Sequence, residues 1–241
     1  MSAGSQLHSA GRGGESGAHV DFIFMLTRSD ETVVDCLDTW AAVERVGVRH
    51  AGFKDVGVDT ATLVELNRRM QAGGVTTYLE VVSTSVEACL QSSRAAVEIG
   101  VDRLMGGTQV DDIMRIIDGS GIEYLPFPGV PVGHPTKLGG DAALVEQQCR
   151  TFDERGCGGV DLLAYRATDA DPLDLVRAAR RGTSGYLVVA GSVSSATQID
   201  DLRSAGADAF TIGSAVFDGS FSPKKGSVVS QLRDVLEAAA Q

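Results

Sequence analysis

From residue 20 onward the chain alternates between two hydrophobic patterns. Short apolar runs rich in β-branched residues are typical of buried strands, and longer segments with apolar residues three or four positions apart are typical of amphipathic helices. Eight runs predict strands, at 21–27, 50–56, 76–82, 101–107, 122–128, 160–166, 186–192 and 209–215. Segments between them predict helices, several ending at a glycine, among them 31–47, 59–74, 85–100, 139–156 and 195–208.

The spacing of these runs predicts a closed barrel. Successive strands begin about 27 residues apart on average, which is the length of one strand and one helix with their loops. Eight such units use the chain evenly from 20 to 241, and this predicts an α/β fold, a single-domain (β/α)₈ TIM barrel. An open doubly wound sheet is the alternative, but no Gly-x-Gly-x-x-Gly follows the first strand.

Residues 1–19 differ from the rest of the chain. They are small and polar, with too little apolar surface to offset the entropy of ordering, so they predict a flexible tail. They lack the apolar core of a signal peptide, and no run of about 18 apolar residues exists to span a membrane.

Composition and charge narrow the class of partner. An apolar fraction of 43% fits a globular domain, and the four cysteines form no CxxC pair, which favours thiols in a cytoplasmic protein. The net charge of −11 repels nucleic-acid phosphates and anionic lipid. We therefore expect neither nucleic acid nor membrane as a partner.

In a TIM barrel the chemistry lies at the carboxyl ends of the strands. Lys54 and Glu80 end neighbouring predicted strands among apolar residues, where an unpaired charge is costly, so we expect them to meet. Together they can divide acid and base roles in proton transfer, or they form a structural ion pair. Asp55 should point to the other side of its strand from Lys54, or cap the next helix.

Other strand ends supply further candidates. Tyr165 and Arg166 end the sixth predicted strand, as a possible proton donor and a cation for an anionic group. Arg28, which follows the first strand near Asp30 and Glu31, is a candidate substrate contact or a solvated charge. Thr108 is a candidate contact to a sugar hydroxyl, or it begins a helix.

The longest interval between strands follows the fifth strand and contains residues 129–140, rich in glycine and proline. Such a loop can fold over a ligand and bring His134 as an acid–base group and Lys137 as a cation. The alternative is that both side chains are simply solvated.

Two Gly-Ser pairs occupy equivalent places after the last two strands. Gly191-Ser192 and Gly213-Ser214 lie 22 residues apart. Glycine allows close approach of the backbone to a phosphate, and the start of the helix after the second pair adds positive potential. The alternative is that these glycines only make tight turns.

These motifs, Ala190-Gly191-Ser192 and Ile212-Gly213-Ser214-Ala215, resemble those of the phosphate-binding barrels. That superfamily of ribulose-phosphate-binding type includes phosphoribosyl isomerases, N-acylmannosamine-6-phosphate epimerases and the tryptophan synthase α subunit. The resemblance implies a phosphorylated sugar or phosphoribosyl ligand. The paired aspartates of the phosphoribosyl isomerases are missing, because the first and fifth strands end Leu26-Thr27 and Phe127-Pro128.

The sequence thus predicts an isomerase or epimerase that acts on a small phosphorylated metabolite by acid–base proton transfer. No motif of metal ligands, P-loop or dinucleotide-binding fingerprint occurs, so we expect no metal and no cofactor. Two alternatives remain: an aldolase or lyase that forms a Schiff base on Lys54, and a non-catalytic barrel that only binds the metabolite. Pairing of two barrels into a homo-oligomer is possible.

Overall fold

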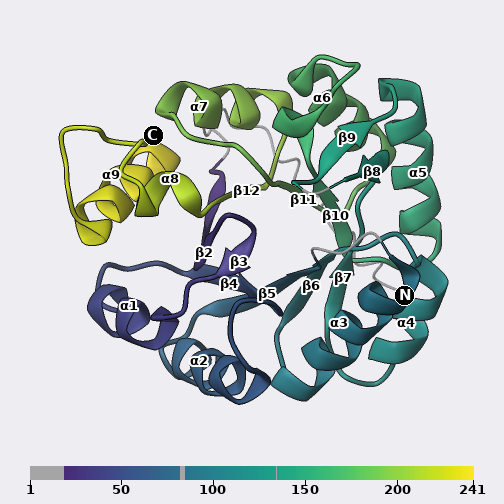
Figure 1. Ribbon diagram of the computed structural model, residues 1–241. Coiled ribbons are helices and arrows are strands. Elements are labelled where there is room, and N and C mark those ends of the chain that lie inside the picture. Colours follow the sequence, from purple (N-terminus) through teal and green to yellow (C-terminus); the bar gives the residue numbers. More distant parts are fainter. Residues whose placement is uncertain (1–18, 82–84, 134) are drawn as a thin grey trace, which may run out of the picture.

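The computed structural model of the protein describes residues 19–81, 85–133 and 135–241. Figure 1 looks into a ring of strands surrounded by helices. The eight parallel strands are β1 (Asp21–Met25), β4 (His50–Lys54), β5 (Thr76–Val81), β6 (Arg103–Gly106), β7 (Glu123–Leu125), β10 (Gly159–Leu162), β11 (Tyr186–Val189) and β12 (Ala209–Ile212). They pair in the order β10-β11-β12-β1-β4-β5-β6-β7.

Backbone hydrogen bonds close this sheet on itself. Between β7 and β10, the Gly158 N–H donates to the Tyr124 carbonyl and the Asp161 N–H to the Pro126 carbonyl, each at 3.0 Å. The predicted (β/α)₈ barrel is therefore confirmed over the open sheet, and all eight predicted strands are present.

The helices lie on the outside of the barrel (Figure 1). They are α1 (Cys36–Val43), α2 (Thr60–Ala72), α3 (Val86–Ile99), α4 (Val110–Ile117), α5 (Ala142–Glu154), α6 (Pro172–Gly182), α7 (Ala196–Ala205), α8 (Ser214–Phe217) and α9 (Val228–Ala240). Most begin at a side chain that accepts a backbone N–H of the first turn. These capping residues are Asp59, Ser85, Asp141, Asp171, Ser195 and Ser227.

Several predicted strands extend too far toward the carboxyl end. The strand predicted at 160–166 stops at Leu162, and a short 3₁₀ turn, η1 (Ala164–Arg166), follows it. The one predicted at 209–215 stops at Ile212, because α8 begins at Ser214. Apolar residues continue past the strand ends and pack over the barrel, so hydrophobicity alone does not mark where pairing stops.

Two short hairpins follow strands at the carboxyl end of the barrel. In the first, β2 (Thr27–Arg28) pairs with β3 (Glu31–Thr32), so the helix predicted at 31–47 begins only at Cys36. In the second, β8 (Val130–Val132) pairs with β9 (Lys137–Gly139) within the glycine-rich segment 129–140.

The core has two shells. Side chains inside the barrel include Ile23, Met25, Tyr78, Met105 and Val188. The larger shell lies between the strands and the helices, and each strand alternates between the two shells.

Polar side chains fill the amino-terminal end of the barrel. The Tyr78 hydroxyl lies 2.9 Å from Nδ1 of His50 and accepts a hydrogen bond from Arg103 at 2.8 Å, while the Tyr186 hydroxyl donates to Asp21 at 2.7 Å. Arg103 also lies 4.3 Å from the centre of the Tyr186 ring. This end is filled by a hydrogen-bonded network.

Three further predictions concern the rest of the chain. The predicted flexible tail, residues 1–19, lies outside the described residues except for His19. Each of the four cysteines is a buried thiol, as the sequence predicts. In the described part of the chain, no helix combines the length and apolarity needed to cross a membrane.

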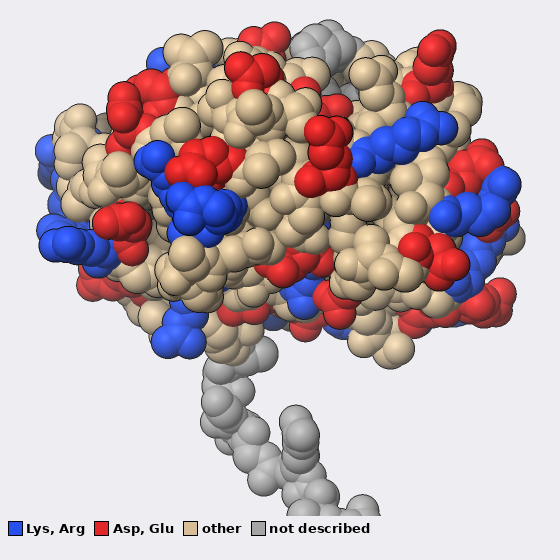
Figure 2. All heavy atoms as spheres, turned by 90° about the horizontal axis from the view of Figure 1, so that it is seen from below, with Lys and Arg blue, Asp and Glu red and all other residues tan. Residues whose placement is uncertain are grey.

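On the side shown in Figure 2, acidic and basic side chains are interspersed rather than separated by sign.

The close contact between α5 and α6 at Gly182 provides a test of the packing. A Cβ atom at Gly182 on α6 would lie 2.5 Å from the Glu146 carbonyl oxygen and 2.7 Å from Cβ of Cys149 on α5. We expect Gly182→Ala to lower the free energy of unfolding by about 1–3 kcal/mol through overpacking. Urea denaturation measures this, with Gly226→Ala as control, since nothing lies within 4 Å of a Cβ there. Equal stability of the two variants would contradict the packing.

Candidate active site

Lys54 and Glu80 meet at the carboxyl end of the barrel, as predicted. They are register partners on the adjacent strands β4 and β5, so both side chains point to the inside. Nζ of Lys54 lies 3.4 Å from Oε2 of Glu80, and the two residues are only 4% and 9% exposed. An ammonium so far from water needs acceptors around it.

Asp30 is the second acceptor, and the sequence analysis missed it as a site residue. Its carboxylate oxygen Oδ1 lies 2.7 Å from Nζ of Lys54 and 3.2 Å from the Arg166 guanidinium. Arg166 also donates to Oδ2 at 3.4 Å. Burial raises the pKa of Asp30, but Lys54 and Arg166 outweigh it and lower the pKa to about 2.

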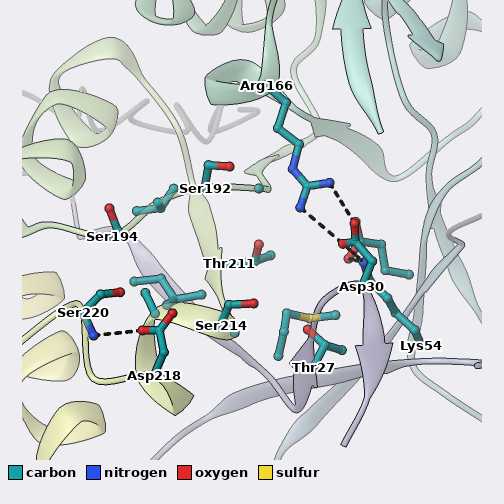
Figure 3. Close-up of a pocket in the computed structure, with 17 residues that line it drawn as sticks. Thr27, Asp30, Lys54, Arg166, Ser192, Ser194, Thr211, Ser214, Asp218 and Ser220 are labelled. Carbon is teal, nitrogen blue, oxygen red and sulfur yellow. Dashed lines mark hydrogen bonds and ion pairs between the residues drawn. The ribbon is translucent and has the colours of Figure 1, made fainter. Parts of the chain in front are cut away.

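The turn between β2 and β3 places Asp30 there. Ser29 and Asp30 are its two central residues, and both have positive φ, 53° and 63°. A two-residue hairpin of this type needs positive φ at both positions, which aspartate tolerates better than most residues. The turn thus places the Asp30 carboxylate between Lys54 and Arg166 (Figure 3).

Lys54 is held as an ammonium. Burial alone lowers the pKa of its amine, but the carboxylates of Glu80 and Asp30 more than compensate and raise it above its usual value. Lys54 is therefore placed to donate a proton or to stabilise a negative oxygen, rather than to act as a neutral nucleophile.

A third carboxyl group, Asp161, lies inside the barrel near this cluster. Its neighbours on β10, Val160 and Leu162, pack in the outer shell, so Asp161 points inward. It is fully buried, and neither carboxyl oxygen has a hydrogen-bond partner among the described residues. Burial, followed by the charge of Glu80, raises the pKa of Asp161 well above its usual value, so this carboxyl favours the protonated form more than an exposed aspartate does.

Asp55 points away from the site, as expected from its position beside Lys54. Its Oδ2 accepts a hydrogen bond of 2.5 Å from the Ser92 hydroxyl on α3. It does not cap the next helix, because Asp59 accepts the Thr62 N–H at the start of α2.

A cavity of about 300 Å³ extends from this cluster to the loops after β11 and β12. Both Gly-Ser pairs line it, together with Arg166 and the hydroxyl-bearing residues shown in Figure 3. Lining residues not identified from the sequence include Asp30, Ser194, Thr211, Asp218 and Ser220. The cavity thus has a charged end and an end made of hydroxyl groups and backbone.

Backbone N–H groups at the second end are unused. Those of Ser192 and Val193 have no acceptor among the described residues, and those of Ser214 and Ala215 begin α8, where no intrahelical acceptor exists. Ser192 has a φ of 63°, and the preceding Gly191 a φ of 80°. The free N–H groups of this turn are therefore available to an anion in the cavity.

Each glycine of the two pairs is also needed for packing. A Cβ at Gly191 would lie 2.6 Å from Nε of Arg166, and one at Gly213 would lie 2.7 Å from Oγ1 of Thr27. The glycines therefore allow close packing, as the tight-turn interpretation requires, and they do so at the border of the cavity.

Four predicted candidates do not line the cavity. Arg28 donates to the Phe217 carbonyl at 3.2 Å and lies over the Phe217 ring. Tyr165 lies in η1, and its buried hydroxyl has no hydrogen-bond partner among the described residues. The charges that act on it are those of Asp201 and Asp171. Thr108 is exposed beside the Gln109 amide, and Lys137 is exposed on β9.

His134 lies outside the described residues. Among the residues that are described, no three His, Cys, Asp or Glu side chains come together in a group that could hold a metal ion.

Comparison with known proteins shows that this chain is similar to several solved structures in its fold. No protein-family model matches the chain, and no curated protein matches it in sequence. Among solved structures, a mutant tryptophan synthase α-subunit from Pyrococcus furiosus is 15% identical with a TM-score of 0.62, over 92% of this chain and 98% of that one. A KDPGal structure is 13% identical with a TM-score of 0.59, over 92% and 91%.

The BexX/CysO complex of Amycolatopsis orientalis also contains a similar chain, 17% identical with a TM-score of 0.58, over 92% of this chain and 88% of that one. At identities this low, the similarity confirms the barrel and carries no activity with it.

The buried carboxyl of Asp161 predicts a pH-dependent stability. Its pKa is higher in the folded than in the unfolded chain, so unfolding releases a proton and stability falls as pH rises above about 4. Asp161→Asn lacks this group. We expect the variant to gain stability relative to the parent as pH rises from 5 to 8, by up to about 1.4 kcal/mol per pH unit.

Urea denaturation across this pH range measures the difference. Asp38→Asn, which changes an exposed carboxylate, is the control and should stay within about 0.5 kcal/mol of the parent. A stability difference between parent and Asp161→Asn that does not change with pH would show that Asp161 is ionised throughout.

Proposed function

We propose that this barrel binds a small phosphorylated metabolite and acts on it as an isomerase or epimerase by proton transfer. The observation that carries the proposal is the arrangement of the cavity. An ammonium between two carboxylates lies at one end, and unused backbone N–H groups lie at the other.

The phosphate group belongs at the end formed by the loops after β11 and β12. The free N–H groups of Ser192, Val193, Ser214 and Ala215 supply donors without bringing a counter-charge. This end also matches the motifs through which the chain resembles phosphate-binding barrels. Asp218 lines the same cavity, but its carboxylate accepts the Ser220 N–H at 2.9 Å.

The carbon chain of the ligand then extends toward Lys54 and Glu80. The Glu80 carboxylate removes a proton from a carbon next to a carbonyl, and the Lys54 ammonium stabilises the negative oxygen of the resulting enolate. Where that carbon carries a hydroxyl, return of the proton to the former carbonyl carbon, with transfer of the hydroxyl proton to the enolate oxygen, gives an isomer. Return of the proton to the opposite face of the original carbon gives an epimer. The atoms balance without a further reactant.

The same geometry disfavours a Schiff base on Lys54. Imine formation requires an unprotonated amine, whereas Nζ lies 2.7 Å and 3.4 Å from two carboxylates that favour the ammonium. Proton transfer uses the lysine in the state in which the structure holds it.

Ligand binding is tested first. We expect one member of a panel of phosphorylated sugars and acids to raise the Tm more than inorganic phosphate does. At about 100 times its Kd, such a ligand adds about 2.7 kcal/mol, or about 5–10 °C in Tm. Ser214→Asp, which places a carboxylate at the exposed start of α8, should abolish the shift.

Thr108→Asp is the matched control, because it adds the same charge at the exposed end of another strand, outside the cavity. Loss of the ligand-induced shift in both variants, or no shift with any phosphorylated compound, would reject the phosphate site.

Proton transfer is tested with the ligand found in this way. In D₂O the parent should exchange a carbon-bound hydrogen of the ligand, detected by ¹H NMR. Glu80→Gln should slow the exchange by about 100-fold or more while the ligand still binds.

Trapping of the ligand on Lys54 with borohydride would instead establish the Schiff-base lyase. Binding with no exchange and no trapping would leave a non-catalytic binding protein.

A further inference from the structure

We propose that Lys54 and Arg166 form a second anion subsite that receives a carboxylate of the substrate, and that Asp30 occupies it until the substrate binds. The substrate is then a phosphorylated acid, with its phosphate at the loops after β11 and β12. The inference rests on the proposed function, because it assigns the other end of the same ligand.

The first argument is the way the two cations bind Asp30. The Arg166 guanidinium contacts both carboxylate oxygens, at 3.2 Å and 3.4 Å, and Nζ of Lys54 contacts one of them at 2.7 Å. A planar guanidinium and a point charge that converge on one carboxylate make a site for that group. The same donors fit a carboxylate of a small molecule.

The second argument is the charge of the cavity. Its lining contains two cations, Lys54 and Arg166, and three carboxylates, Asp30, Glu80 and Asp218. With Asp30 in place, a doubly charged phosphate enters a cavity that already has more negative than positive groups, which is unfavourable at low local dielectric constant. Withdrawal of Asp30 leaves both cations available to the ligand.

The third argument is how the hairpin is attached. Its base is held firmly: the Thr32 hydroxyl donates to the Lys54 carbonyl at 2.7 Å, the Lys54 N–H donates to that hydroxyl at 2.9 Å, and the Thr32 N–H donates to the Val56 carbonyl at 2.9 Å. On β2, Arg28 is bound to Phe217.

The tip differs from the base. No hydrogen bond of Ser29 to a described residue is present, and the side-chain contacts of Asp30 are those to Lys54 and Arg166. Both residues of the turn have positive φ although neither is glycine. A competing carboxylate therefore has only these ion pairs to replace in order to release the tip.

Arg166 connects this subsite with the phosphate end. A side chain at Gly191 would overlap its guanidinium, so the cation lies directly against the Gly191-Ser192 turn. One arginine thus borders both ends of the cavity, which suits a short ligand with two anionic groups.

Binding of matched small molecules tests the subsite. Calorimetry would compare 3-phosphoglycerate with glycerol 3-phosphate, which has the same carbon chain without the carboxylate, and with glycerate, which lacks the phosphate. Asp30→Asn is the informative variant, because asparagine keeps the preference for positive φ and removes the competing charge. We expect it to tighten binding of 3-phosphoglycerate relative to glycerol 3-phosphate by about tenfold or more.

Two further variants provide the controls. Asp218→Asn removes a carboxylate from the same cavity but not from the subsite, so it should change the affinities of the two phosphorylated probes by similar factors. Arg166→Met in the Asp30→Asn background should remove the preference for 3-phosphoglycerate. In the parent, that ligand should also speed amide hydrogen exchange in peptides covering residues 27–32, as the tip is released.

The outcomes separate the two proposals. If glycerol 3-phosphate binds, but removing Asp30 gives no gain specific to the carboxylate-bearing probes, the subsite is rejected and the phosphate site stands. If neither phosphorylated probe nor inorganic phosphate binds, but glycerate binds Asp30→Asn more tightly than the parent and requires Arg166, the phosphate site falls and the subsite stands. Failure of all probes, with unchanged hydrogen exchange, rejects both.

Discussion

The arrangement of the barrel opening depends on the burial of one ammonium group. The Lys54 side chain is 6% exposed, and a charge in such a place is tolerated only if acceptors surround it. Two elements satisfy this requirement: β5 places Glu80 beside Lys54 by strand register, and the β2–β3 turn brings Asp30 from above. Arg166 then balances Asp30. Negative and positive groups therefore alternate from Glu80 through Lys54 and Asp30 to Arg166, and all four line the cavity.

Asp161 is the exception to this balance. Lys54, Glu80, Asp30 and Arg166 each have an ion-pair partner within 3.4 Å. The Asp161 carboxyl has no hydrogen-bond partner among the described residues. An unsatisfied buried carboxyl group lowers stability, and such groups are concentrated at functional sites. Asp161 lies inside the barrel close to the ion pair of Lys54 and Glu80.

The sequence predicted much of this structure and missed particular parts of it. Alternating hydrophobic periods were sufficient for eight strands, the barrel and the meeting of Lys54 with Glu80, because strand register places equivalent positions side by side. Asp30 was missed because its position depends on a two-residue turn with positive φ, for which Ser-Asp is a weaker signal than Asn-Gly. Asp161 was missed because a single acidic residue within the predicted strand 160–166 was not treated as inward-facing. The period-two alternation of that strand was the available signal. Arg28 and Tyr165 do not line the cavity, since being near a strand end does not say which way a side chain points.

The pairing of β1 with β12 has a consequence for how the protein is made. These are the first and last strands of the barrel, and the cavity takes its lining from both: Met25, Thr27 and Asp30 near one end of the chain, and residues 211–220 near the other. During synthesis on the ribosome, the first half of the barrel exposes the edge of β1 that later pairs with β12. At that stage Lys54 has Glu80 and Asp30 beside it but lacks Arg166. The site comes into existence only when the final strand emerges and joins β1. A ligand therefore stabilises chains in which β12 has paired with β1 over chains that end before β12.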